Sequence, residues 1–124
     1  MSTVEARPTL SPRAERVRER FARTPLATKV NVVDLDLPTV EVAPADWPAV
    51  ARFLRDDPDC RYDLFLDLAG VDNAKRSGRP TRFEAVVHLH SLSRNEHVRV
   101  KVLLPDGTEP SLPSVIDVWP AANW

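Results

Sequence analysis

Two alternating segments between residues 82 and 104 constrain the fold of this chain more than any other feature. RFEAVVHLHS and EHVRVKVLL each alternate apolar and polar side chains across a short polar stretch, which is typical of an antiparallel β-hairpin. A two-residue turn at Arg94 and Asn95 pairs Ser93 with Glu96 and sets the register of the whole hairpin. The partners that this register predicts are Leu89 with Val100 and Val87 with Val102 on one face, and His90 with Arg99 and His88 with Lys101 on the other.

An amphipathic helix is predicted over residues 46–57. Asp46 is a suitable N-cap, and Pro58 ends the segment. The apolar side chains recur at positions i, i+3, i+4 and i+7, which places them on one face: Trp47, Val50, Ala51 and Leu54. This face is expected to cover one side of a sheet.

Residues 39–42 and 62–72 also alternate as strands do, and residues 73–81 are a polar loop. Within 62–72 the alternation predicts two opposite faces, one with Tyr62, Leu64, Leu66 and Leu68 and one with Asp63, Phe65 and Asp67. A dinucleotide-binding fold is not expected, because strands and helices do not alternate regularly. The predicted fold class is α+β, with two layers: a mostly antiparallel β-sheet and the amphipathic helix packed on one face.

The first part of the chain adds an N-terminal helix to this plan. Residues 1–10 are predicted to be a disordered tail, and residues 11–24 a helix with Ser11 as N-cap. Its apolar stripe is narrow (Ala14, Val17 and Phe21), so this helix is expected to be a loosely docked arm or a partner-binding one. The domain prediction is a single α+β domain over 11–124, in which 105–124 form a tail that can dock on a partner.

Charge and cysteine content exclude several classes of protein. The 17 basic and 18 acidic residues leave a formal net charge of -1, which gives no basic field for nucleic acid. A single cysteine, Cys60, cannot form an intrachain disulfide, a thiolate zinc site or a four-thiolate cluster. The chain has no apolar run near the roughly 18 residues of a membrane span, and its N-terminus has no secretory leader pattern.

The polar side chains do not assemble into visible catalytic machinery. His88 and His90 share a strand face that could hold a metal, but the predicted register sets Arg99 and Lys101 opposite them, so a basic, solvated or partner-facing surface is favoured. Asp63 and Asp67 share a strand face, with Asp72 just beyond; such carboxylates could act as acid and base or hold magnesium, but they are interpreted as the surface acids of a half-exposed strand. The acids before Cys60 would raise its pKa. A basic patch at residues 75–82 is interpreted as a charged loop.

The end of the chain, SVIDVWPAANW, concentrates large apolar side chains where chains are usually frayed and polar. Trp119 and Trp124 flank Pro120, and together they could bury roughly 300–500 Å². Such a segment should find a surface, on its own sheet or on a partner. We predict a partner interface at Trp119, Pro120, Asn123 and Trp124, and no catalytic, cofactor-binding or metal-binding residue.

Three stretches together resemble the C subunit of the proton-pumping NADH–quinone oxidoreductase, respiratory complex I. They are DWPAVARFLRDDPDCRYDLFLDLAGVD, the hairpin RFEAVVHLHSLSRNEHVRVKVLLP and the closing PSVIDVWPAANW, which match the family in order and spacing over residues 39–124. The hairpin alone would be a generic β pattern, whereas its distance to the closing segment makes the resemblance specific. The family continues past the position of Trp124 into a C-terminal part that is not in this sequence.

The resemblance implies a non-catalytic structural subunit of the hydrophilic arm. Such a subunit supports electron transfer from NADH to quinone by docking on the large quinone-pocket subunit. The FMN, the iron–sulfur clusters and the quinone are expected on other subunits, with none bound by this chain. The expected location is peripheral, on the cytoplasmic side of the inner membrane, with no nucleic acid partner.

Three alternatives remain open at this point. One is a free-standing interaction module of the same fold, and another is a subunit of a related membrane-bound hydrogenase. The third is a small enzyme that uses His88 and Asp67. Fold alone does not decide among them.

Overall fold

The computed structural model describes residues 10–73, 83–105, 113, 115 and 117–119. Its elements, in chain order, are α1 (Pro12–Ala22), η2 (Pro25–Thr28), β1 (Val30–Asp34), β2 (Pro38–Val42), η3 (Pro44–Asp46), α2 (Trp47–Asp56), β3 (Leu64–Asp72), β4 (Phe83–Ser91) and β5 (Glu96–Leu104). The five strands form one sheet in the order β1-β2-β5-β4-β3. Only the β2–β5 pair is parallel, so the predicted α+β class with a mostly antiparallel sheet is confirmed.

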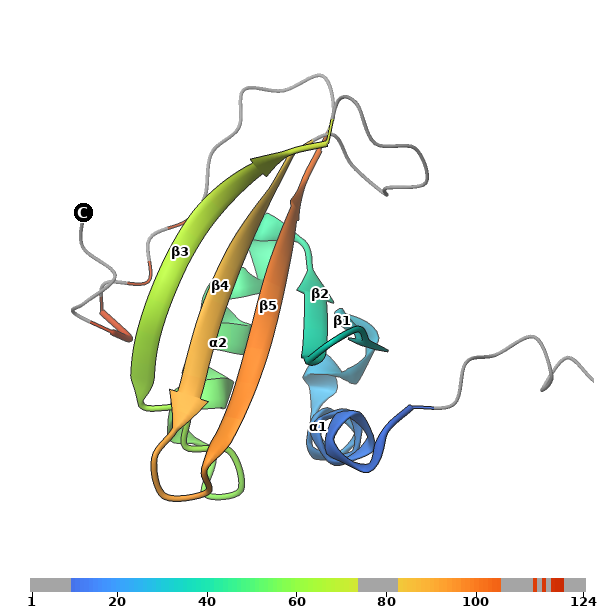
Figure 1. Cartoon of the computed structure of the whole chain (residues 1–124), viewed down its shortest axis with the longest axis vertical. Helices are drawn as coiled ribbons and strands as arrows, with labels where there is room; N and C mark the ends of the chain where they lie inside the picture. The colour runs from blue at the N-terminus through green and yellow to red at the C-terminus, as the bar shows by residue number, and fades with distance from the viewer. Residues whose placement is uncertain (1–9, 74–82, 106–112, 114, 116, 120–124) are drawn as a thin grey trace, which may run out of the picture.

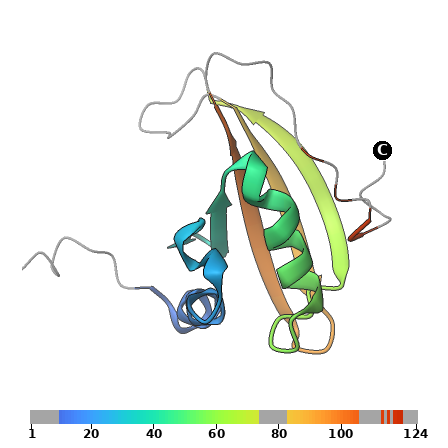
Figure 2. The ribbon, with the colours of Figure 1, turned by 180° about the vertical axis from the view of Figure 1, so that it is seen from behind.

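Helix α2 covers one face of this sheet (Figure 1 and Figure 2). Its predicted apolar face is the buried one, since Trp47, Val50, Ala51 and Leu54 are all fully enclosed. They pack on the inner face of the hairpin, which is formed by Val87, Leu89, Val98, Val100 and Val102. The predicted cap differs in detail: Asp46 makes no side-chain capping bond, because the 3₁₀ turn η3 leads directly into the helix.

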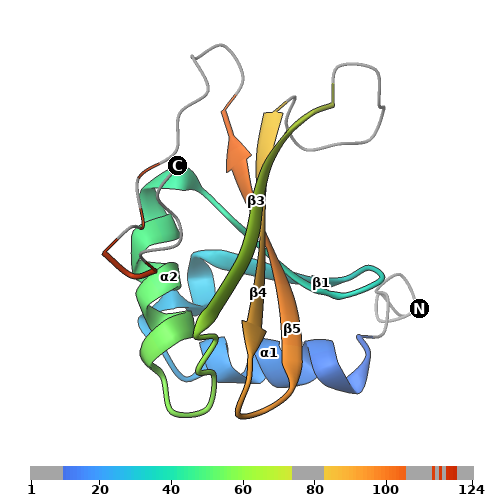
Figure 3. The same cartoon turned by 60° about the vertical axis from the view of Figure 1, so that its left-hand side comes forward.

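Helix α1 lies at the end of the sheet where β4 turns into β5 (Figure 3). The Ser11 hydroxyl accepts the Ala14 amide at 3.2 Å and caps the helix as predicted. Ala14, Val17 and Phe21 are buried, and the Phe21 ring lies 4.8 Å from Phe53 of α2. The predicted tail 1–10 falls almost wholly outside the described residues.

The predicted hairpin register is wrong by two residues. The connection is a four-residue turn, Leu92–Asn95, so that Ser91 and not Ser93 pairs with Glu96. Asn95 ends this turn in the left-handed region, with φ 51°, a conformation that asparagine tolerates better than most residues. A shift of two keeps each side chain on its predicted face but changes its partner: His90 lies opposite His97, and His88 opposite Arg99.

The predicted faces of β3 are also wrong. A β-bulge between Phe65 and Asp67 inserts one extra residue against β4, so the alternation reverses partway along the strand. Phe65 and Leu68 pack against the core, whereas Leu64 and Leu66 are 38% and 49% exposed. A single inserted residue is enough to turn a leucine that alternation assigns to the core toward the surface.

Candidate partner-binding surface

The described part of the C-terminal segment packs on the chain's own domain. Trp119 is 3% exposed, and its indole N–H donates to the Tyr62 carbonyl at 2.9 Å. Its ring lies 6.2 Å from that of Trp47 and 5.7 Å from that of Phe65. Arg55 of α2 fixes the neighbouring backbone by donating to the Val118 carbonyl at 2.7 Å. These contacts close the domain between α2 and β3.

Of the four predicted interface residues, the structure describes Trp119 alone. The Trp119 side chain lies inside the domain, in an aromatic cluster that sequence periodicity does not reveal because its members come from three segments. Pro120, Asn123 and Trp124 fall outside the described residues. A partner contact at 119–124 therefore stays a prediction.

A buried polar cluster, which the sequence reasoning missed, ties α1 to the hairpin. The guanidinium of Arg20, 7% exposed, donates to both carboxylate oxygens of Glu96 at 2.8 and 3.1 Å. The Tyr62 hydroxyl donates to the same carboxylate at 3.1 Å. The hydrogen bond from Arg20 lowers the pKa of Glu96, whereas burial, together with that carboxylate, raises the pKa of Tyr62. A buried arginine on a helix rich in surface arginines has no distinguishing signal in the sequence.

The outer face of the sheet, opposite α2, carries the histidines. His88 Nδ1 and His97 Nε2 lie 2.9 Å apart, so one ring donates an N–H and the other must be neutral to accept it. Burial, followed by the nearby His88, His90 and Arg99, lowers the pKa of His97. Arg99 makes a bidentate pair with Asp36 at 2.8 and 3.0 Å. Among the residues that the structure describes, no three His, Cys, Asp or Glu side chains are arranged to hold a metal ion.

The other candidate groups are dispersed. Asp67 lies opposite His88 across the β3–β4 pair, whereas Asp63 precedes the strand and accepts the Leu92 amide at 3.4 Å. Cys60 is buried, and burial, with help from Asp57, raises the pKa of its thiol to about 12. The thiol is therefore protonated at neutral pH, and it is enclosed. The basic patch at 75–82 falls outside the described residues.

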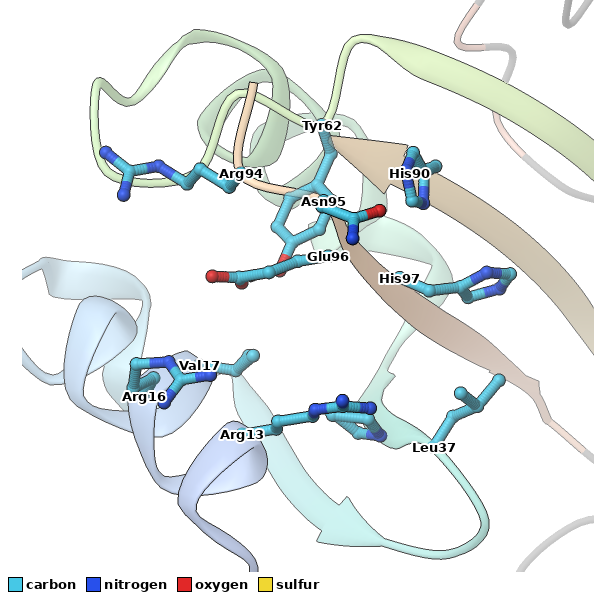
Figure 4. Close-up of a pocket in the computed structure, with 11 residues that line it drawn as sticks. Arg13, Arg16, Val17, Leu37, Tyr62, His90, Arg94, Asn95, Glu96 and His97 are labelled. Carbon is cyan, nitrogen blue, oxygen red and sulfur yellow. The ribbon is translucent and has the colours of Figure 1, made fainter. Parts of the chain in front are cut away.

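A hollow lies between α1 and the turn of the hairpin. We call it the α1 pocket; its volume is about 420 Å³. Arg13 and Arg16 of α1 form one wall, and Asn95 and His97 form the wall across from them (Figure 4). The described helices offer no span that is long and apolar enough to cross a bilayer.

Comparison with known proteins identifies the family. Residues 40–124 match the family described as respiratory-chain NADH dehydrogenase, 30 Kd subunit. The C subunit of the NADH-quinone oxidoreductase from Albidiferax ferrireducens is 43% identical over 97 residues, which are 76% of this chain and 48% of that protein. The corresponding C subunit from Verminephrobacter eiseniae is 41% identical over 119 residues, 90% of this chain and 57% of that protein. The chain thus spans about half the length of these relatives.

Solved structures agree with the sequence match. The structure of a trypsin-resistant fragment (1-134) of Nqo5 superposes with a TM-score of 0.67 at 26% identity, covering 90% of this chain and 84% of that one. A chain of an archaeal membrane-bound sulfane sulfur reductase shares the fold, with a TM-score of 0.64 at 24% identity over 87% of this chain and 59% of that one. Because the family match covers residues 40–124 and the fold is shared, this chain belongs to the family of the 30 kDa subunit of respiratory-chain NADH dehydrogenase.

Proposed function

We propose that this chain acts as a non-catalytic structural subunit in the hydrophilic arm of a proton-translocating NADH:quinone oxidoreductase. The observation that carries the proposal is the family match over residues 40–124, together with identities of 41–43% to C subunits of NADH-quinone oxidoreductases. The described residues are consistent with a supporting role, because their one thiol is enclosed and protonated and their carboxylates are paired or dispersed. The subunit supports electron transfer from NADH to quinone by docking on the large quinone-pocket subunit.

The proposal assigns the redox groups to other subunits. FMN, the iron–sulfur clusters and the quinone are held elsewhere in the complex, and this chain binds none of them. Its partners are the large quinone-pocket subunit and other subunits of the hydrophilic arm. It is peripheral, on the cytoplasmic side of the inner membrane.

The docking contact is proposed to include residues 119–124. Trp124 is the better residue to test, because the Trp119 side chain is buried within the domain and its removal would also weaken the fold. The Trp124→Ala variant should weaken recovery of the large subunit while the thermal unfolding of the chain stays unchanged. Equal recovery with Trp124→Ala and the parent chain would argue against a contact at this position.

The overall function is tested by recovering the tagged full chain from gently solubilised membranes. Recovery of the large subunit, together with loss of NADH:quinone activity from membranes of a strain that lacks the gene, is the expected result. Recovery of the chain alone, with normal membrane activity in the deletion strain, would favour the free-standing module. Recovery with hydrogenase subunits instead would favour that alternative.

A further inference from the structure

We propose that the N-terminal half of α1, with the α1 pocket beside it, binds an acidic segment of a partner protein. Arginines recur along this helix and its C-cap at spacings of three and four, so they form one stripe: Arg13, Arg16, Arg20 and Arg23. We call these four residues the arginine stripe. This inference does not rest on the proposed function, because its test needs only the chain and a peptide.

The two halves of the arginine stripe differ in their partners. Arg20 and Arg23 are paired within the chain, with Glu96 at 2.8 Å and Asp59 at 2.9 Å. Arg13 and Arg16 are exposed, and the described part of the chain gives neither of them an ion pair. The acid between them in sequence, Glu15, accepts instead from Arg18 at 2.8 Å. The molecule thus presents two adjacent guanidinium groups that no described acid binds in an ion pair, although Arg16 lies near enough to Glu96 to help lower the pKa of that carboxyl.

The α1 pocket gives these two arginines room for a bound carboxylate. Its far wall offers a further N–H donor from the Asn95 amide, and another from Nδ1 of the His97 ring when its Nε2 accepts from His88 (Figure 4). The only carboxylate in the lining, that of Glu96, is already bound to Arg20 and Tyr62. An entering carboxylate would accept a bidentate hydrogen bond from one guanidinium, the strongest pairing open to an arginine side chain.

A second hollow, of about 460 Å³, is lined by the same two arginines. Its acids are already engaged, because Asp34 accepts the Ser11 amide at 2.6 Å and Asp36 is held by Arg99. Arg13 and Arg16 therefore line two hollows, which suits two carboxylates about one helical turn apart. We infer a peptide with acids at that spacing.

Two other anionic partners fit this surface less well. A nucleic acid or an anionic membrane presents a continuous run of phosphates, whereas the described residues around the two hollows offer only two arginines without an ion pair, Arg13 and Arg16, to neutralise it. The formal net charge of -1 supplies no long-range attraction for such a polyanion. Separate carboxylates on side chains can enter the hollows one at a time.

The test measures binding of the full chain to a fluorescent alanine-based helical peptide with glutamates at three- and four-residue spacing, at low ionic strength. We expect Arg13→Gln and Arg16→Gln each to weaken binding roughly tenfold. The control is Arg52→Gln, which removes the same charge from an exposed position on α2, away from both hollows, and should leave binding unchanged. Thermal unfolding should be unaltered in all three variants, because these side chains are exposed.

Several results would overturn the proposal. One is an equal loss of binding with Arg52→Gln, which would mean that only overall charge matters. Another is equal binding of a peptide with glutamines in place of the glutamates. A third is tighter, Arg13- and Arg16-dependent binding of inorganic phosphate, of single-stranded RNA or of vesicles containing phosphatidylglycerol, which would assign the surface to a phosphate-bearing ligand instead.

Discussion

At the scale of single residues, Trp119 and Trp47 stack on each other in the core but differ in their polar atoms. Both side chains are buried, and their rings lie 6.2 Å apart. The Trp119 indole N–H donates to the Tyr62 carbonyl at 2.9 Å, whereas the buried Trp47 indole N–H has no hydrogen-bond partner in the described part of the chain. A buried donor without a partner costs free energy, and a satisfied one does not. Comparing the two tryptophans therefore separates the contribution of packing to stability from the contribution of the hydrogen bond.

Replacing each tryptophan by phenylalanine should affect stability unequally. Both changes leave a similar void, but Trp119→Phe also leaves the Tyr62 carbonyl without its donor, whereas Trp47→Phe removes an unpaired N–H. We expect Trp119→Phe to lower the free energy of unfolding by about 1–2 kcal/mol more than Trp47→Phe does. Urea unfolding followed by circular dichroism measures both values. Equal losses would show that the Trp119 hydrogen bond contributes nothing beyond packing.

The Arg20–Glu96 pair predicts a specific acid sensitivity. Its hydrogen bond from Arg20 holds the pKa of Glu96 below the ordinary value of 4.5 in the folded chain. A carboxylate whose pKa is lower when folded contributes stability that is fully present above pH 4.5 and is lost as the pH falls through the folded-state pKa. Glu96→Gln should lower the free energy of unfolding at pH 7 by about 1.5–3 kcal/mol and flatten its pH dependence below pH 4.5.

Chemical unfolding of the parent and Glu96→Gln chains at several pH values checks this prediction. Glu41→Gln is a suitable control, because Glu41 also lies in the sheet but accepts, within the described part of the chain, only from the neutral Asn31 side chain. Parallel pH profiles for the Glu96→Gln and parent chains would contradict the assigned role of the pair.

At the scale of elements, the spacing of apolar residues predicted the buried faces of the helices, but it did not predict how the strands pair. The buried face of α2 and the buried stripe of α1 could be predicted, because helical spacing depends only on neighbouring residues. The register of the hairpin could not, because it depends on whether the turn has two residues or four. The bulge in β3 could not be predicted either. Leu66 has leucines two residues before and after it, so the sequence looks like an ordinary alternating strand whether or not a residue is inserted there.

The bulge is tested by placing a charge on each side of it. Leu66 is exposed, whereas Leu68 packs against the core, although both were assigned to one face by alternation. Leu66→Asp should change the free energy of unfolding by less than about 1 kcal/mol, and Leu68→Asp should lower it by about 3 kcal/mol or more. Thermal and urea unfolding of the two variants give the comparison. Similar losses at both positions would mean that the strand is not bulged in solution.

The candidate surfaces were hard to predict for the same reason: each combines residues from elements that lie far apart in the sequence. Sequence reasoning located the tryptophans of the closing segment but placed Trp119 on a partner, because its ring partners, Trp47 and Phe65, come from elements far away in the chain. The α1 pocket was equally hidden, since α1 and the turn at Asn95 meet only in the folded chain. Helical spacing could have revealed the arginine stripe, because its positions recur at three and four.

At the scale of the whole molecule, the sheet is asymmetric. Strand β5 is hydrogen-bonded on both sides, by β2 and β4, and its inner face is covered by α2. Strand β3 is the last strand in the order and is paired only with β4, and it carries the exposed Leu64 and Leu66. Among the described residues, β5 is thus paired along both edges, whereas the outer edge of β3 is paired with no described strand.

Hydrogen exchange of the full chain should reveal this asymmetry. The amides of β5 are expected to exchange most slowly, near the rate set by global unfolding, because this strand lies between two others and beneath α2. Along residues 64–71 of β3, amides that point toward β4 should be protected, whereas those that point outward, where the described part of the chain supplies no strand, should exchange orders of magnitude faster. Residue-resolved exchange by NMR, repeated at several protein concentrations, makes the measurement. Uniform protection along β3 at every concentration would show that its outer edge is already covered within the chain, and the edge would then be closed to any partner.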